Sequence, residues 1–264
     1  MPWLSEVRYS REATVAAVID YFEFLAKMYI KESDILRPPE GGWPEITPDR
    51  FRDLGKTDEV ILLLRHLPYL ASTADGWNAD AGPSGCHFYW WLEDARSLGS
   101  HGLDVETMKM MTQGSHYSEA GMIPPHVVGL VSSKWDFFLL DTELGVVYWP
   151  ECPDGIKERP AREPIEDDPY DYAAENEADW RAEGPCWAVA DFFEVLKDQF
   201  RWLCFVPRSQ YHVCEVYGRV HPMFEGMIPM MQAVYREHGW PDLERYRKEE
   251  CLRAVAAMLR ENYP

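Results

Sequence analysis

The sequence has no hydrophobic stretch long enough to cross a bilayer. Its longest apolar runs, such as residues 60–64 and 137–140, fall far short of the ~20 residues that a spanning helix needs. The N-terminus has no basic region followed by an apolar stretch, and no Asn-x-Ser/Thr sequon occurs, so no secretory signal is predicted. Basic residues are scarce, with 26 Lys and Arg against 45 Asp and Glu, giving a formal net charge of −19. This charge disfavours membrane surfaces and nucleic acid and favours a basic protein partner or a cationic small molecule.

The six cysteines show no CxxC spacing and are scattered through apolar or aromatic surroundings. Such a pattern is typical of reduced, buried thiols rather than of a disulfide scaffold, and it predicts a cytoplasmic protein. His212 and Cys214, with Cys204 and His221 nearby, could in principle hold zinc. Their spacing matches no standard ligand set, so we predict no metal site.

Motifs for nucleotide binding and nucleophilic catalysis are also missing. No Walker A sequence, GxGxxG or HExxH is present, and we predict no cofactor. Residues 82–86 resemble the GxSxG nucleophile elbow around Ser84, but Cys86 replaces the final glycine. The predicted strand also follows Ser84, whereas in that motif it precedes the serine. A catalytic Ser84 is therefore disfavoured.

Hydrophobic residues make up 46% of the chain and aromatic residues 14%, enough for a full core. The periodicity predicts helices near residues 10–30, 57–67, 185–203, 225–238 and 242–260. It predicts strands near residues 86–91, 127–131, 137–140, 146–149 and 211–217. We expect a single α+β domain over residues 1–264, with a central antiparallel sheet flanked by helices. Asp141 and Glu143 are expected to serve the hairpin turn between the second and third central strands.

Residues 151–183 differ in composition from the rest of the chain. They hold 12 acidic and 4 basic residues, together with four prolines. Charge repulsion and proline predict an acidic excursion outside the core.

One segment combines aromatic rings with carboxylates. On an extended strand, His87, Tyr89 and Trp91 would share one face. Ring faces attract a cation, and carboxylates bind guanidinium in pairs. The candidate ligand-binding residues are His87, Trp91, Glu93 and Asp94, and a second polar group is His116, Tyr117 and Glu119. The alternative is that the aromatic residues belong to the core and the acidic residues form a solvated turn.

Three stretches carry a resemblance to a known family. They are LLRHLP at 63–68, LLDTELGVVY at 139–148 and ADFFEVL at 190–196, and together they resemble the SMI1/KNR4 (SUKH) superfamily. The resemblance covers residues 50–205. It implies a SUKH-like α+β fold and an acidic intracellular protein-interaction module, and it implies no catalytic residue.

A second resemblance rests on PPEGGWP at 38–44 and HLPY at 66–69. These stretches are similar to fungal proteins of specialised metabolism, among them the arginine-containing cyclodipeptide synthases. The alternative function is therefore a small-molecule enzyme that uses aminoacyl-tRNA. In that case a basic patch would bind the tRNA backbone through Arg245, Arg247, Lys248 and Arg253.

Overall fold

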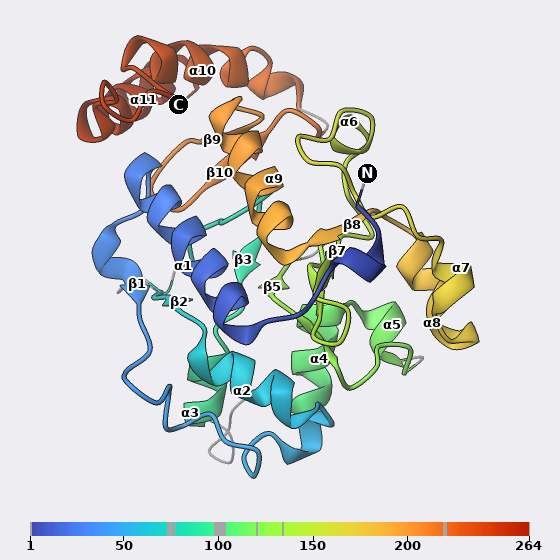
Figure 1. Ribbon diagram of the computed structural model, residues 1–264. Helices are drawn as coiled ribbons and strands as arrows, with labels where there is room; N and C mark the ends of the chain where they lie inside the picture. Colours follow the sequence, from blue (N-terminus) through green and yellow to red (C-terminus); the bar gives the residue numbers. More distant parts are fainter. Residues whose placement is uncertain are drawn as a thin grey trace.

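The structure is a computed structural model, shown in Figure 1. It describes residues 2–72, 76, 78–97, 104–119, 121–133, 135–218 and 221–263. Helices flank antiparallel sheets, so the predicted α+β class is confirmed. The larger hydrophobic cluster takes residues from the first helix through to the last. None of the helices within these ranges is long and apolar enough to cross a membrane.

The central sheet has four strands in the order β4-β6-β7-β8, all antiparallel. They are β4 (Val127–Gly129), β6 (Leu139–Asp141), β7 (Val146–Tyr148) and β8 (Cys186–Ala188). The predicted meander is confirmed, because β4, β6 and β7 pair in sequence order. Asp141 forms the turn as expected, because its Oδ1 accepts hydrogen bonds from the backbone N–H groups of Glu143 and Leu144. Gly145 completes the turn at φ 76°, which favours glycine.

Three two-stranded ladders surround this sheet. They pair β1 (Ile35–Leu36) with β2 (Tyr69–Leu70), β3 (His87–Phe88) with β5 (Val131–Ser132), and β9 (Phe205–Pro207) with β10 (Val213–Glu215). The strand predicted at 86–91 is therefore shorter than expected. Its partner β5 offers only two residues, and Trp91 already begins a helix, whose first turn Glu93 and Asp94 stabilise.

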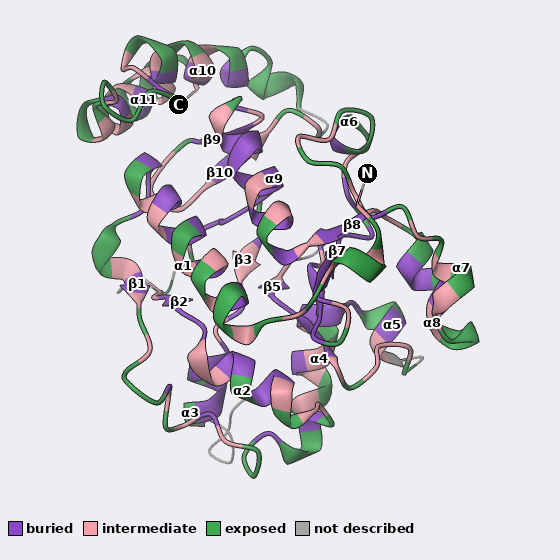
Figure 2. Cartoon of the chain, in the orientation of Figure 1, coloured by how far each residue is buried: buried purple, intermediate pink, exposed green. Residues whose placement is uncertain are grey.

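Two helices packed side by side cover the middle of the molecule (Figure 1). They are α1 (Arg11–Met28) and α9 (Val189–Arg201). The predicted N-cap of α1 is confirmed, because Ser10 Oγ accepts the N–H of Ala13. The predicted start of the later helix at residue 185 is wrong. Residues 186–188 join the sheet as β8, where Trp187 pairs with Val147. Figure 2 shows that α9 is largely buried, with the exposed Ala190 near its start.

The remaining helices complete the layers around the sheets. They are α2 (Asp58–His66), α3 (Trp91–Ser97), α4 (Val105–Gln113), α5 (Ser115–Glu119), α10 (Met227–Glu237) and α11 (Lys248–Asn262). Short 3-10 turns lie at Leu4–Glu6, Glu32–Asp34, Arg52–Leu54 and Pro222–Phe224. Thr57 caps α2 as predicted. The two C-terminal helices pack against each other (Figure 1), and α11 starts six residues later than predicted.

The acidic segment 151–183 forms three short helices, and most of its residues are exposed or half-buried. It holds α6 (Asp154–Lys157), α7 (Pro169–Tyr172) and α8 (Glu175–Ala182). Trp180 is fully buried in a second hydrophobic cluster that packs on the outer face of the sheet. Arg181 is also buried and pairs with Asp141 at 2.9 Å. One large ring and one cation thus anchor a segment whose charge otherwise favours solvent.

Candidate functional site

Three adjoining pockets lie along β3, β10 and the loop at 78–85. The first, about 380 Å³, is lined by His87, Trp90, Glu93 and Asp94 among others. It shares Asn78 and His87 with the central pocket, of about 410 Å³. The central pocket shares Ser84 with the third, of about 590 Å³. We call the three together the acidic groove.

Carboxyl groups dominate the lining of this groove. Within the described residues they number seven, against two Lys or Arg side chains, Lys157 and Arg208. The seven are Asp80, Glu93, Asp94, Asp136, Glu151, Asp154 and Glu215. Such a lining raises the local concentration of cations and repels anions.

Asp80 holds the walls of the groove together. Its backbone N–H donates to the carbonyl of Tyr211, and its Oδ2 accepts the N–H of Val213 at 2.8 Å. It also forms an isolated antiparallel bridge with His87. One residue therefore joins β3 to β10 and places the side chains of both strands on the same pocket.

In the third pocket, Asp136 lies close enough to repel both Glu151 and Glu215. Burial raises the pKa of Asp136 to about 6, although its Oδ1 accepts a hydrogen bond from Trp149 Nε1 at 3.1 Å. Burial, with the charge of Asp136 as a smaller cause, raises the pKa of Glu151 and of Glu215 to about 7. A bound cation would relieve this repulsion and hold the carboxyl groups ionised.

The raised pKa of Asp136 predicts a stability change with pH. Because its ordinary value is 3.8, the folded state binds more protons than the unfolded chain between pH 3.8 and about 6. The contribution of Asp136 to the free energy of unfolding is therefore largest below pH 3.8, and it falls as pH rises from 3.8 to about 6. Asp136→Asn keeps an acceptor for Trp149 but cannot ionise. In urea unfolding, its free energy of unfolding should fall by about 2–3 kcal/mol less than that of the parent protein over this pH range.

The matched control is Asp171→Asn, because Asp171 is exposed on α7. That variant should leave the pH dependence of the free energy of unfolding as it is in the parent protein. Parallel curves for Asp136→Asn and the parent would show that Asp136 ionises normally in the folded state.

The central pocket places two histidines beside one buried carboxylate. Asp80 Oδ1 lies 3.3 Å from His87 Nδ1, and Oδ2 lies 4.0 Å from His212 Nδ1. The Asp80 side chain is 3% exposed, against 30% for His87 and 32% for His212. Burial raises the pKa of Asp80, while the hydrogen bond from Val213 and the neighbouring His87 act to lower it.

The structure brings part of the first predicted group together. His87, Glu93 and Asp94 line one pocket, as a cation site would require. Trp91 does not reach it, because helix α3 turns its ring into the core, where it is 1% exposed and packs on Tyr89 at 4.7 Å between ring centroids. Trp90 takes its place in the lining. The predicted alternation fails because the extended strand ends at Phe88.

The second predicted group lies apart from the groove. The Tyr117 hydroxyl donates to Glu183, and the ring lines a separate pocket of about 110 Å³. His116 is exposed on α5 and packs edge-on to Tyr117. Glu119 is the last residue of α5, and its side chain lies outside the described part of the structure.

The four cations of the predicted basic patch have different environments. Lys248 Nζ donates to the carbonyl oxygens of Ala26 and Ile30, so it is bound to the end of α1. Arg247 pairs with Glu250 at 2.8 Å. Arg253 donates to the backbone of its own helix, and Arg245 is exposed. A phosphate-binding role stays a prediction for all four.

Sequence analysis missed Asp80, Asp136, Glu151 and Glu215. Their spacing gives no signal, because tertiary folding alone brings these segments together. Ser84 lies exposed between two of the pockets, and its backbone N–H donates to the Glu215 carboxylate. Across the described ranges, no group of three or more His, Cys, Asp and Glu side chains is arranged to hold a metal ion.

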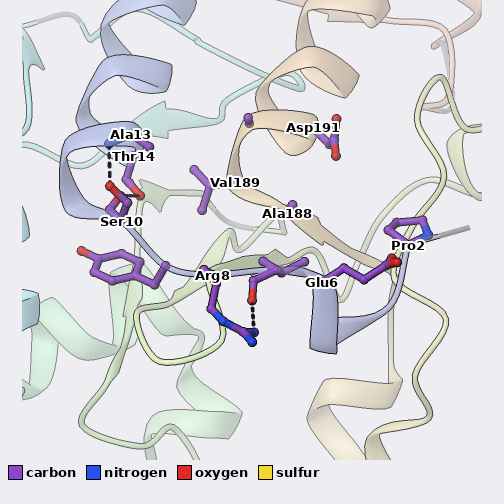
Figure 3. A pocket seen from close by; sticks show the side chains of 13 residues that line it. Pro2, Glu6, Arg8, Ser10, Ala13, Thr14, Ala188, Val189 and Asp191 are labelled. Atoms are coloured by element: carbon purple, nitrogen blue, oxygen red, sulfur yellow. Dashed lines mark hydrogen bonds between the residues drawn. The ribbon is translucent and has the colours of Figure 1, made fainter.

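A further pocket, of about 360 Å³, lies between the N-terminal segment and the start of α9 (Figure 3). Its polar groups serve the local backbone. Ser10 Oγ accepts the N–H of Ala13, and Arg8 donates to the carbonyl oxygens of Ser5 and Val7. Glu6 and Asp191 line this pocket beside Arg8, so its charges are mixed and few.

Comparisons with protein-family models, curated proteins and solved structures found no match to this chain. The resemblance to the SMI1/KNR4 superfamily therefore stays a prediction, and the groove is interpreted from its own residues.

Proposed function

We propose that the protein is an acidic interaction module, of the kind that the SMI1/KNR4 resemblance implies, and that it binds a basic segment of a partner protein in the acidic groove. The observation that carries this proposal is the row of carboxyl groups along three adjoining pockets. Arginine side chains suit such a site, because a guanidinium binds carboxylates in pairs and also stacks on rings. Trp90, Tyr217 and the exposed Trp135 supply those rings.

The test uses a peptide of alternating arginine and glycine, with citrulline replacing arginine in a matched neutral peptide. Trp135, which is 67% exposed at the third pocket, provides a fluorescence signal for titration. We expect the arginine peptide to bind and the citrulline peptide to bind at least about tenfold more weakly. Affinity for the arginine peptide should rise from about pH 5 to about pH 8, as the carboxyl groups of Asp136, Glu151 and Glu215 ionise. It should fall with added salt.

Asp136→Asn with Glu215→Gln should weaken binding of the arginine peptide by about tenfold or more. The control pair, Asp171→Asn with Glu175→Gln, removes the same net charge from exposed positions on α7 and α8, outside the groove. If both double variants lost the same affinity for the arginine peptide, net charge and not the groove would be what attracts the peptide.

The alternative, a small-molecule enzyme, has one observation in its favour: the buried Asp80 beside His87 in the central pocket. If that enzyme depended on aminoacyl-tRNA, the tRNA would bind at Arg245, Arg247, Lys248 and Arg253. In either case we place the protein in the cytoplasm, because all six cysteines are free thiols.

A further inference from the structure

We propose that Asp80 and His87 form a general-base dyad that hydrolyses carboxylic esters in the central pocket. The dyad begins with an unusual carboxylate. Asp80 Oδ1 is shielded from solvent and the side chain is 97% buried, while the carboxylate interacts with the backbone N–H groups of Val213 and Gly85. A carboxylate at this depth is costly unless donors or a cation face it. His87 Nδ1, at 3.3 Å, is the group that faces it.

The position of the His87 ring follows from this contact. Its Nδ1 is shielded from solvent, while 30% of the side chain is exposed. The exposed part of the side chain therefore does not include Nδ1. The 3.3 Å approach of Nδ1 to Asp80 favours the neutral tautomer with its proton on Nδ1, which leaves Nε2 unprotonated and available as a base.

His87 is a better base candidate than His212. The Asp80 oxygen nearer to His212, Oδ2, already accepts the Val213 N–H at 2.8 Å, and the His212 Nδ1 lies 4.0 Å away. Oδ1 faces the closer histidine, His87, at 3.3 Å. Asp80 is thus a positioning residue, which sets the tautomer and orientation of His87 and stabilises the imidazolium that forms.

The reaction needs only water as a second reactant. His87 Nε2 takes a proton from a water molecule as the water oxygen forms a bond to the ester carbonyl carbon, and the carbonyl electron pair moves to its oxygen. The C–O bond to the alcohol then breaks, and His87 returns its proton to the leaving alkoxide. Arg208 lines the same pocket and has the charge that a developing oxyanion requires.

The acyl group is expected to carry a cation, and this part rests on the proposed function. Glu93 and Asp94 lie on one side of His87, and the third pocket lies beyond Ser84 on the other. The probes are Nα-acetyl-arginine ethyl ester and its neutral counterpart, Nα-acetyl-norleucine ethyl ester. We expect hydrolysis of the arginine ester, at least about tenfold faster than that of the neutral ester.

His87→Gln should reduce this hydrolysis to the buffer rate. Asp80→Asn, whose amide oxygen can still accept the Val213 N–H, should lower kcat by about 100-fold or more and shift the pH profile. The groups facing His87 that shape this profile are Asp80, His212, Arg208, Glu93 and Asp94. His66→Gln, at the end of α2 and outside the groove, is the matched control and should keep the parent rate.

Circular dichroism of each variant separates loss of activity from loss of fold. Hydrolysis by the parent protein that does not exceed the rate of a folded His87→Gln variant, with both esters, would overturn the dyad. If the arginine peptide still binds in that case, the proposed function stands without it. Equal hydrolysis of both esters would support the dyad and contradict the cation preference of the groove.

Discussion

Arg181→Met is expected to lower the free energy of unfolding by about 3–5 kcal/mol at neutral pH, because it removes the guanidinium that pairs with the buried carboxylate of Asp141. Asp141 is fully buried, and its Oδ2 lies 2.9 Å from the Arg181 guanidinium, which is 3% exposed. The guanidinium also lies over the rings of Trp180 and Tyr148, at 4.5 and 5.0 Å from their centroids. Methionine retains much of the apolar volume, so urea unfolding of this variant measures mainly the missing charge.

The pH dependence of this loss has a definite sign. Burial acts to raise the pKa of Asp141, but hydrogen bonds from His126 and Leu144 and the charge of Arg181 outweigh it and hold the pKa below its ordinary value of 3.8. A lowered pKa stabilises the folded state above that value, and the stabilisation is lost as pH falls. The difference in the free energy of unfolding between the parent protein and Arg181→Met should therefore become smaller below about pH 4.

Arg52→Met is the matched control, because Arg52 pairs with Asp49 where both side chains are largely exposed. An exposed pair of this kind contributes about 0–1 kcal/mol. Adding Asp141→Asn to Arg181→Met should restore part of the lost stability by removing the buried charge. Similar losses in Arg181→Met and Arg52→Met would contradict a buried ion pair that anchors α8.

Local sequence signals predicted those elements whose cause is local. Ser10 and Thr57 are followed by amphipathic runs, and the caps and helices form there as expected. The hairpin between β6 and β7 was predicted from the apolar runs at 137–140 and 146–149 and from the turn residues between them, Asp141 to Gly145. The sequence does not predict that α9 begins at Val189. Residues 186–188, just before it, are apolar and fit either a buried strand or the first turn of a helix. Only pairing with β7 decides between them.

The acidic segment shows the same limit at longer range. Its net charge argues for solvent exposure, but Arg181 finds its partner 40 positions earlier in the chain, at Asp141. No local spacing connects the two. In the groove, His87, Glu93 and Asp94 were predicted because they are neighbours in sequence. Asp80, Asp136 and Glu215 come from separate segments, so their shared burial and raised pKa values follow from the tertiary fold alone.

Gly129→Ala is expected to lower the free energy of unfolding by about 3 kcal/mol or more, because the added methyl group has no space. An alanine Cβ at this position in β4 would lie 1.9 Å from the backbone oxygen of Thr112 and 2.6 Å from its carbonyl carbon. Thr112 is fully buried near the end of α4, and its Oγ1 donates to the carbonyl of Met108. A backbone atom cannot rotate away, so α4 or β4 must move.

Gly218→Ala is the matched control. Its Cβ would first meet Glu215 Oε1 at 3.3 Å, which is the flexible end of a side chain, and we expect a loss below about 1 kcal/mol. Thermal or urea unfolding compares the two variants directly, and equal stability would show that α4 does not pack on β4 at this distance. Because Met111 of α4 lines the first pocket, a shift of α4 in Gly129→Ala should also weaken binding of the arginine peptide. Loss of stability and loss of binding in one variant would connect the packing of the central sheet to the shape of the acidic groove.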